Sequence, residues 1–386
     1  MKLESVETLF IRLPLRRPHR VASSYNPHLG AYVIVKLHTD EGITGLGEAP
    51  TLPEWGGDFG HYYGETPHTV RHVVEELLFP RIRGQSPFAV EQLHHLMDQV
   101  IVGHPYAKAA VDIAVFDIIG KALGVPVCQL LGGPFREKVP LADSIGIMDI
   151  DTAVTEAVAM TADGIKTIKL KVGLNPERDV TLVREVRQAV GNEVNLTVDA
   201  NQGYRTPKEA INTLRRMEKY NILFAEQPVE GLEAMSQVTA AVDIPIMADE
   251  SAWTAYDVMQ IARSKAADMI SLYISKPGGL WPALKAASVA EAAGLPCNVN
   301  GSAEMGVGNA ANLHLSAALP IVSLAGCFNV TTLRGREQTR IGGLFYLDDI
   351  ITEPFKYQDG YLYVPDRPGL GVELDEEKIT RYRVDQ

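Results

Sequence analysis

The strongest constraint on the fold is a repeated pattern between Thr167 and Lys276, where five short apolar runs each end in charged residues. Each run has the length and the Val, Ile, Leu or Thr content of a buried strand, and each precedes a stretch with helical apolar spacing. The runs are TIKLKVG (167–173), VNLTVDANQ (194–202), LFAEQPV (223–229), PIMADES (245–251) and MISLYISKPGG (269–279). Strands that alternate with helices predict a parallel sheet covered by helices. In a (β/α) barrel the carboxyl ends of such strands meet at one rim, where catalytic residues converge.

Three of these runs end in carboxylates, namely Asp199, Glu226 and Asp249. A single Asp at a strand end is more often a helix N-cap than a ligand. Three carboxylates on successive strands would repel one another in a buried pocket unless a cation lay between them. Oxygen-only ligands suit a hard divalent ion, so the pattern predicts Mg²⁺, with Mn²⁺ as a possible substitute.

Lysines lie on either side of these carboxylates in the strand order. Lys169 and Lys171 are two residues apart on one predicted strand, so they share a face, and Lys276 follows a later strand. A lysine near positive charge has a depressed pKa and can act as a neutral base close to pH 7. The three lysines are therefore candidate catalytic residues for moving a proton next to a metal-bound carboxylate.

The order K-x-K, D-x-N, E-Q-P, A-D-E-S and S-K-x-G-G resembles the enolase superfamily, and within it the muconate lactonizing enzyme subgroup. The resemblance runs over nearly the whole chain. It implies that the three carboxylates bind Mg²⁺ and that Lys171 and Lys276 are acid/base residues on opposite faces of the substrate, with Lys169 tuning Lys171. The mandelate racemase subgroup has a His on the seventh strand, whereas residues 296–301 here read PCNVNG.

Length and pattern together suggest two domains. A chain of 386 residues suits a barrel of roughly 250 residues plus a second domain. In residues 1–49 apolar and polar residues alternate, which predicts an antiparallel sheet of about three strands. Apolar residues at helical spacing then predict helices over 68–82, 87–101 and 107–124. The resemblance implies an α/β fold, a modified TIM barrel (β/α)₇β over residues 131–324. An α+β capping domain would span residues 1–130 and be completed by residues 325–386.

Two loops are candidates for substrate contact. One covers residues 16–30, and the other, residues 50–67, concentrates glycine, proline and aromatic residues. Such aromatic side chains are costly to leave in water without a use. The resemblance implies that both loops fold over the barrel mouth, so the candidate substrate-binding residues are Tyr25, Trp55 and Tyr62.

Glu304 is a fourth candidate for substrate binding. It matches the family's glutamate at the junction of strands 7 and 8, in an E-x-x-x-G frame that ends at Gly308. The alternative is a carboxylate that caps the following helix. The residues before it, Gly301, Ser302 and Ala303, differ from the family's usual T-M-L.

Composition excludes several other classes of protein. The net charge of −12 argues against nonspecific nucleic-acid binding. The three cysteines are widely spaced without a C-x-x-C motif, which predicts neither a disulfide framework nor a zinc site and fits a reducing compartment. The acidic N-terminus does not read as a signal peptide, and no run of 18 apolar residues predicts a membrane span. We therefore expect a cytoplasmic enzyme, and the resemblance implies a homo-oligomer.

The resemblance implies enolate chemistry on a small carboxylate substrate. Its most specific form is muconate cycloisomerase, which converts cis,cis-muconate to muconolactone. The subgroup also includes racemases and epimerases of amino-acid derivatives (N-acyl amino acids, dipeptides, proline betaine), o-succinylbenzoate synthase and acid-sugar dehydratases. A different class, a Schiff-base aldolase using Lys171 or Lys276, would leave the three carboxylates unexplained. A non-catalytic binding barrel is a further alternative, which the complete set of acid/base residues disfavours.

Overall fold

The computed structural model describes the chain except for residues 16–18, 23–30, 61, 63, 329–345 and 386. Tyr25, one of the candidate substrate contacts, lies outside the described residues.

The N-terminal part forms an antiparallel sheet backed by helices. Strands β1 (Leu3–Arg12), β2 (Ala31–Thr39) and β3 (Thr44–Ala49) pair in the order β1-β2-β3. Helix α4 (Pro105–Leu123) packs so closely on β3 that a Cβ at Gly45 or Gly47 would lie about 2 Å from carbonyl oxygens of α4. Glycine at these two positions therefore permits the close contact between helix and sheet.

The stretch expected as one helix over 68–82 is interrupted. It consists of α1 (Pro67–His72), the π-helical turn η2 (Val73–Leu78) and α2 (Phe79–Ile82). Pro80 has no N–H to donate to the preceding turn, and the N–H of Phe79 instead bonds to the carbonyl of Val74, five residues earlier. Helices α3 (Val90–Val100) and α5 (Val127–Leu130) complete this part of the chain.

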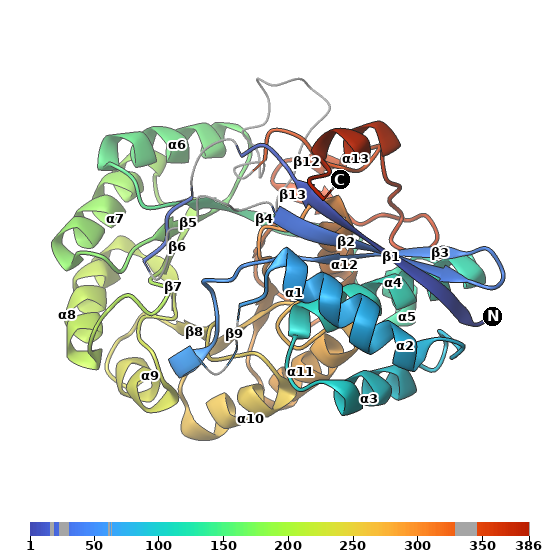
Figure 1. Ribbon diagram of the computed structural model, residues 1–386. Helices are drawn as coiled ribbons and strands as arrows, with labels where there is room; N and C mark the ends of the chain where they lie inside the picture. Colours follow the sequence, from blue (N-terminus) through green and yellow to red (C-terminus); the bar gives the residue numbers. More distant parts are fainter. Residues whose placement is uncertain (16–18, 23–30, 61, 63, 329–345, 386) are drawn as a thin grey trace.

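The rest of the chain forms the predicted barrel, and the fold class is confirmed. Parallel strands β4 to β10 are paired in chain order. Strand β11 pairs with β4, and Val322, shortly before β11, forms a bridge with Cys297 of β10. Helices α6 to α11 follow one another around the outside of this sheet, as Figure 1 shows. The strands are β4 (Lys138–Ile145), β5 (Thr167–Lys171), β6 (Asn195–Asp199), β7 (Ile222–Glu226), β8 (Ile246–Ala248), β9 (Met269–Leu272), β10 (Cys297–Val299) and β11 (Gly326–Cys327). The helices are α6 (Ile150–Ala162), α7 (Pro176–Val190), α8 (Pro207–Met217), α9 (Leu232–Thr239), α10 (Ala255–Ser264), α11 (Leu280–Ala293) and α12 (Gly306–Ala318).

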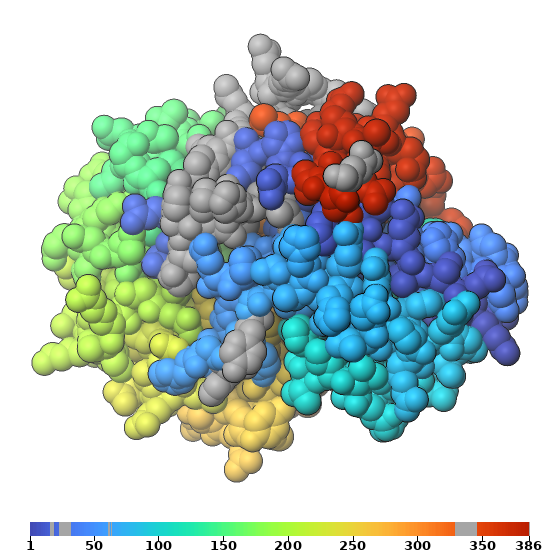
Figure 2. Space-filling model, viewed as in Figure 1, coloured from blue at the N-terminus to red at the C-terminus, as the bar shows by residue number. Residues whose placement is uncertain are grey.

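The C-terminal tail contacts both parts of the molecule. Strand β11 lies past residue 324, where we expected the cap to resume, and the hairpin of β12 (Tyr357–Gln358) and β13 (Tyr361–Tyr363) pairs antiparallel with the barrel strand β4. Helix α13 (Glu376–Tyr382) then reaches β1, where Arg383 forms a bridge with Ile11. In Figure 2 these red C-terminal residues lie directly against the blue N-terminal ones.

Two buried aspartates of α4 join the cap to the barrel and the tail. Asp117 accepts hydrogen bonds from the backbone N–H groups of Leu46 and Leu370, each at 2.8 Å. Asp112 accepts one from the N–H of Leu280 at the start of α11, at 2.5 Å. Both carboxylates therefore have a structural role. For Asp117, its apolar neighbours in the sequence already favour this role. In the part of the chain that the structure describes, no helix is both long and apolar enough to cross a membrane.

Candidate active site

The charged strand ends meet at one rim of the barrel because the parallel strands are in register. Lys171 on β5 pairs with Asp199 on β6, and Asp199 pairs with Glu226 on β7. Asp249 follows β8 directly, and Lys276 follows β9. All five side chains are at least nine-tenths buried. Residues that are far apart in sequence therefore form one buried cluster of charges.

Lys169 and Lys171 hold the first two carboxylates. The Nζ of Lys169 lies 2.7 Å from both Asp199 Oδ2 and Glu226 Oε1. The Nζ of Lys171 donates to Asp199 Oδ2 at 2.7 Å and to Asn201 Oδ1 at 2.8 Å. Burial alone would raise the pKa of Asp199, but the two lysines keep it well below its usual value. Burial alone would lower the pKa of Lys169, but the carboxylates of Asp199 and Glu226 keep it well above its usual value.

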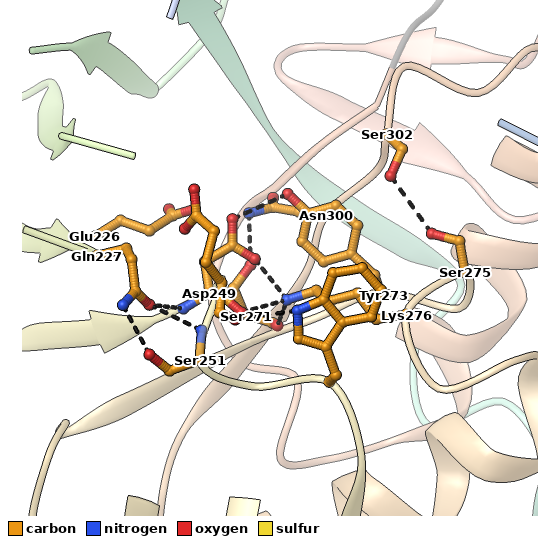
Figure 3. A network of polar contacts seen from close by, with 12 residues as sticks. Glu226, Gln227, Asp249, Ser251, Ser271, Tyr273, Ser275, Lys276, Asn300 and Ser302 are labelled. Atoms are coloured by element: carbon orange, nitrogen blue, oxygen red, sulfur yellow. Dashed lines mark hydrogen bonds and ion pairs between the residues drawn. The ribbon is translucent and has the colours of Figure 1, made fainter. Parts of the chain in front are cut away.

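Lys276 holds the third carboxylate from the other side. Its Nζ donates to the Oδ1 and the backbone carbonyl of Asp249 and to the carbonyl of Ser271, as Figure 3 shows. The ammonium group also lies 4.2 Å from the ring centre of Tyr273 and 5.8 Å from that of Trp55. These π faces favour a cation at this position.

The carboxylates fit a hard divalent cation by their chemistry. Among the described residues, no three acidic, His or Cys side chains are grouped as a metal site, and one oxygen of each of the three carboxylates contacts a lysine ammonium group. The second oxygens of Glu226 and of Glu250 are buried and have no hydrogen-bond partner within the described part of the chain. Burial, followed by the charges of Asp199 and Asp249, raises the pKa of Glu226 well above its usual value. A buried oxygen without a partner beside like charges is the environment that cation coordination would satisfy.

The pocket beside this cluster contains about 910 Å³ of space between atoms, counting its open mouth. The residues that line the pocket include Lys169, Lys171 and Asp249 of the charged cluster, together with Trp55 and Glu304. The ammonium of Lys276 is fully buried behind Asp249, so the candidate bases differ in their exposure to this space.

Two of the candidate substrate-binding residues line the pocket, and a third does not. Trp55 and Glu304 line the pocket, and burial raises the pKa of Glu304 to about 7. The capping position that the sequence allows for Glu304 is filled by Glu48, which accepts the N–H groups of Met305 and Gly308. Tyr62 stacks on Trp253 and donates to Asp257, and it does not line the pocket.

The second hydrogen-bond partner of Lys171, Asn201, was not predicted from the sequence. Asn201 Oδ1 accepts from Lys171, and Asn201 Nδ2 donates to Glu250 Oε1 at 2.9 Å. Burial, then the charge of Asp249, raises the pKa of Glu250 to about 8. The D-x-N and A-D-E-S runs contain Asn201 and Glu250, so the signal was present, but only the fold brings the two residues together.

Fold and site together define a barrel enzyme with three buried carboxylates between Lys171 and Lys276. Residues 5–132 match the family model of the mandelate racemase/muconate lactonizing enzyme N-terminal domain, and residues 152–378 match the enolase C-terminal domain-like model. The chain belongs to the enolase superfamily, in its muconate lactonizing enzyme-like subgroup. It is thus a metal-dependent isomerase by class.

Three relatives illustrate the range within this subgroup. The N-succinyl-L-Arg/Lys racemase of Bacillus cereus is 35% identical over 391 residues, 100% of this chain and 99% of that protein, and its crystal structure gives a TM-score of 0.90. The Pseudomonas fluorescens muconate lactonizing enzyme, complexed with muconolactone, is 31% identical with a TM-score of 0.90, covering 99% of both chains. The Enterococcus faecalis dipeptide epimerase, complexed with Mg and L-Leu-L-Tyr, is 30% identical with a TM-score of 0.87, covering 97% of this chain and 100% of that one.

Proposed function

We propose that this enzyme racemises or epimerises an N-acylated amino acid or a dipeptide by moving the proton next to the substrate carboxylate. The observation that carries the proposal is the placement of Lys171 and Lys276. Lys171 is the last residue of β5, and Lys276 lies on the loop after β9. Strands β6, β7 and β8, which lead to the three carboxylates, lie between β5 and β9. Two bases on opposite sides of one substrate carbon are what inversion at that carbon requires.

Each residue has a defined part in this proposal. One lysine, in its neutral form, removes the α-proton, and the other returns a proton to the opposite face. Asn201 orients Lys171, and the carbonyl of Ser271 orients Lys276. A divalent cation held by Asp199, Glu226 and Asp249 would supply the positive charge that stabilises the substrate carboxylate during proton removal.

The pocket's own charges favour an amino-acid derivative. Glu54 and Glu304 line the pocket together with Asp249. The amide N–H group or a cationic side chain of an amino-acid derivative would find acceptors in these carboxyl groups. The identity to the B. cereus racemase over the whole chain supports the same choice.

Muconate cycloisomerisation is a second candidate, and His19 supports it. This residue belongs to the R-P-H run that resembles muconate-type enzymes, and it lines the pocket. A protonated imidazole there would attract the second carboxylate of muconate. The likeness to the P. fluorescens enzyme also favours this candidate. A cycloisomerase can work with one of the two lysines, so the pair alone does not decide.

One experiment separates these candidates. Purified protein with Mg²⁺ or Mn²⁺ would be incubated in D₂O with N-succinyl-L-Arg, N-succinyl-L-Lys, L-Ala-L-Glu and L-Leu-L-Tyr, and the α-proton signal followed by NMR. In parallel, the diene absorbance of cis,cis-muconate would be recorded. We expect α-proton exchange with at least one amino-acid derivative, abolished by excess EDTA and restored by Mg²⁺. Loss of diene absorbance without any α-proton exchange would overturn racemisation in favour of cycloisomerisation.

A borohydride test addresses the aldolase alternative. A Schiff-base enzyme forms a covalent imine between lysine and a carbonyl substrate, and borohydride traps it without metal. We expect no trapped adduct at Lys171 or Lys276 by mass spectrometry after incubation with pyruvate as a carbonyl probe.

A further inference from the structure

Asp58 lies on the loop between β3 and α1, the second of the two loops expected to cover the barrel mouth. Figure 1 places the short helical turn of this loop, drawn in blue, beside β8 and α9. Other residues of the loop also contact the barrel: Trp55 donates to Glu250, and Tyr62 donates to Asp257 and stacks on Trp253. The carboxylate of Asp58 accepts hydrogen bonds from three barrel loops at once.

Both oxygens of this carboxylate accept hydrogen bonds from the barrel. Oδ1 accepts from Gln202 Nε2 at 2.7 Å and from the backbone N–H of Gly231 at 3.1 Å. Oδ2 accepts from Ser251 Oγ at 2.6 Å. These three partners belong to three separate loops, and hydrogen bonds to an ionised acceptor are stronger than neutral ones.

The three loops are those that follow the candidate metal ligands. Gln202 follows Asp199 after β6, Gly231 follows Glu226 after β7, and Ser251 follows Asp249 after β8. One cap carboxylate therefore joins the loops of all three ligands. Nothing in the sequence spacing places Asp58 at this position.

A buried glutamine extends the connection from Ser251 to the ligand itself. Gln227, fully buried, donates from Nε2 to Ser251 Oγ at 2.8 Å. Its Oε1 accepts the backbone N–H groups of Asp249 at 2.9 Å and of Ser251 at 3.2 Å, as Figure 3 shows. The backbone N–H of Gln202 also donates to the carbonyl of Gln227 at 2.8 Å. Two side chains thus connect Asp58 with the backbone of a candidate ligand.

We propose that Asp58 is a positioning residue that couples closure of the cap loop to the arrangement of the three barrel loops bearing Asp199, Glu226 and Asp249. With the loop closed, its carboxylate fixes these loops relative to one another. When these hydrogen bonds break, the cap loop and the barrel loops become mobile together. The assignment of the three carboxylates as metal ligands rests on the proposed function, whereas the coupling of the loops does not.

The test compares Asp58→Asn with the matched variant Asp40→Asn. Asparagine keeps the size of the side chain but removes its charge and presents an amide NH₂ group to at least one donor. Asp40 is an exposed acid in the β2–β3 turn, bonded to the N–H of Lys2. Gln202→Ala, which breaks one of the three hydrogen bonds, should produce a smaller change in the same direction and guards against misfolding of Asp58→Asn.

Hydrogen exchange without metal or substrate is the primary measurement. In Asp58→Asn we expect exchange about tenfold faster both in peptides covering residues 52–60 and in those covering residues 199–206, 226–232 and 249–254. Unchanged exchange in the three barrel loops, whatever the cap loop does, would overturn the proposal. This outcome is independent of the reaction that the enzyme catalyses.

Metal affinity is the second measurement, followed by the paramagnetic resonance signal of free Mn²⁺. We expect Asp58→Asn to bind Mn²⁺ about tenfold more weakly than Asp40→Asn, as for other residues that orient ligands. Equal affinities would overturn the coupling. If the unsubstituted protein binds no Mn²⁺, the assignment of the three carboxylates as metal ligands fails. The hydrogen-exchange result alone then tests the proposed role of Asp58.

Discussion

Lys276 donates hydrogen bonds to both the side-chain Oδ1 and the backbone carbonyl of Asp249, at 2.5 and 2.8 Å. A candidate base and a candidate metal ligand are therefore hydrogen-bonded directly to each other, and both side chains are fully buried. A substitution at either residue removes the charge partner of the other, and an uncompensated buried charge is costly. Effects on metal binding and on proton transfer must consequently be measured separately.

Asp249→Asn should weaken metal binding strongly and abolish activity. The amide removes one of the three negative charges, and cation affinity depends strongly on ligand charge. We expect Mn²⁺ to bind more weakly by about 100-fold or more in a titration of the free-ion signal. Asp243→Asn, an exposed acid near the start of β8, is the matched control and should bind as the unsubstituted protein does. Full activity in Asp249→Asn would eliminate the metal assignment.

Lys171→Ala should retain substrate binding and lose α-proton exchange. Removal of a general base typically lowers the rate by about 10³-fold. For a racemase Lys276→Ala should have an effect of similar size, because each lysine serves one face of the substrate. Deuterium uptake by NMR checks both variants, with the exposed Lys166→Ala as the control. Normal uptake in Lys171→Ala would remove that lysine from the mechanism.

His314 should make the protein less stable at mildly acidic pH. The ring is fully buried, and its Nδ1 accepts from the N–H of Cys128 while Nε2 donates to the carbonyl of Leu370. Burial lowers its pKa from 6.5 to about 4, so between these values the unfolded chain binds a proton that the folded one does not. Stability present above pH 6.5 is therefore lost as the pH falls toward 4, by up to about 3 kcal/mol.

Urea unfolding at pH 7 and pH 4.5 measures this loss. We expect a smaller difference between the two pH values in His314→Gln than in the unsubstituted protein, since glutamine does not titrate. His95→Gln, on the exposed face of α3, is the control and should keep the original difference. The same pH difference in all three proteins would rule out His314 as the cause.

Asp117→Ala should lower the free energy of unfolding without touching the site. Its carboxylate accepts two backbone N–H groups, from β3 and from the tail, and bonds to Lys121 Nζ at 2.6 Å. Alanine removes this acceptor from the two buried N–H groups, while Lys121 keeps the carbonyl of Thr44. We therefore expect a loss of about 3 kcal/mol by urea unfolding. Asp366→Ala, on the exposed surface, is the control. Equal stability of the two variants would contradict this structural role.

The barrel strands and their helices were predictable because the signals are local. Strand β5 lies within the run at 167–173, and helix α11 begins directly after the run at 269–279, where helical apolar spacing is expected. The helix expected over 68–82 was less accurate, because Pro80 changes its hydrogen bonding. Periodicity reports which face of an element is buried, and a single proline inside it can alter the backbone without changing that pattern.

By itself, the sequence determined the order of the βα units and the charged residue that ends each strand. Parallel pairing then brings these ends to one rim, because the carboxyl ends of all such strands point the same way. Only the tertiary structure decided which distant residues complete the site. Asp58 reaches the loops after β6, β7 and β8, Glu48 holds the start of α12, and Asn201 joins Lys171 to Glu250. These contacts depend on how the cap docks on the barrel and how the loops turn, which no local periodicity encodes.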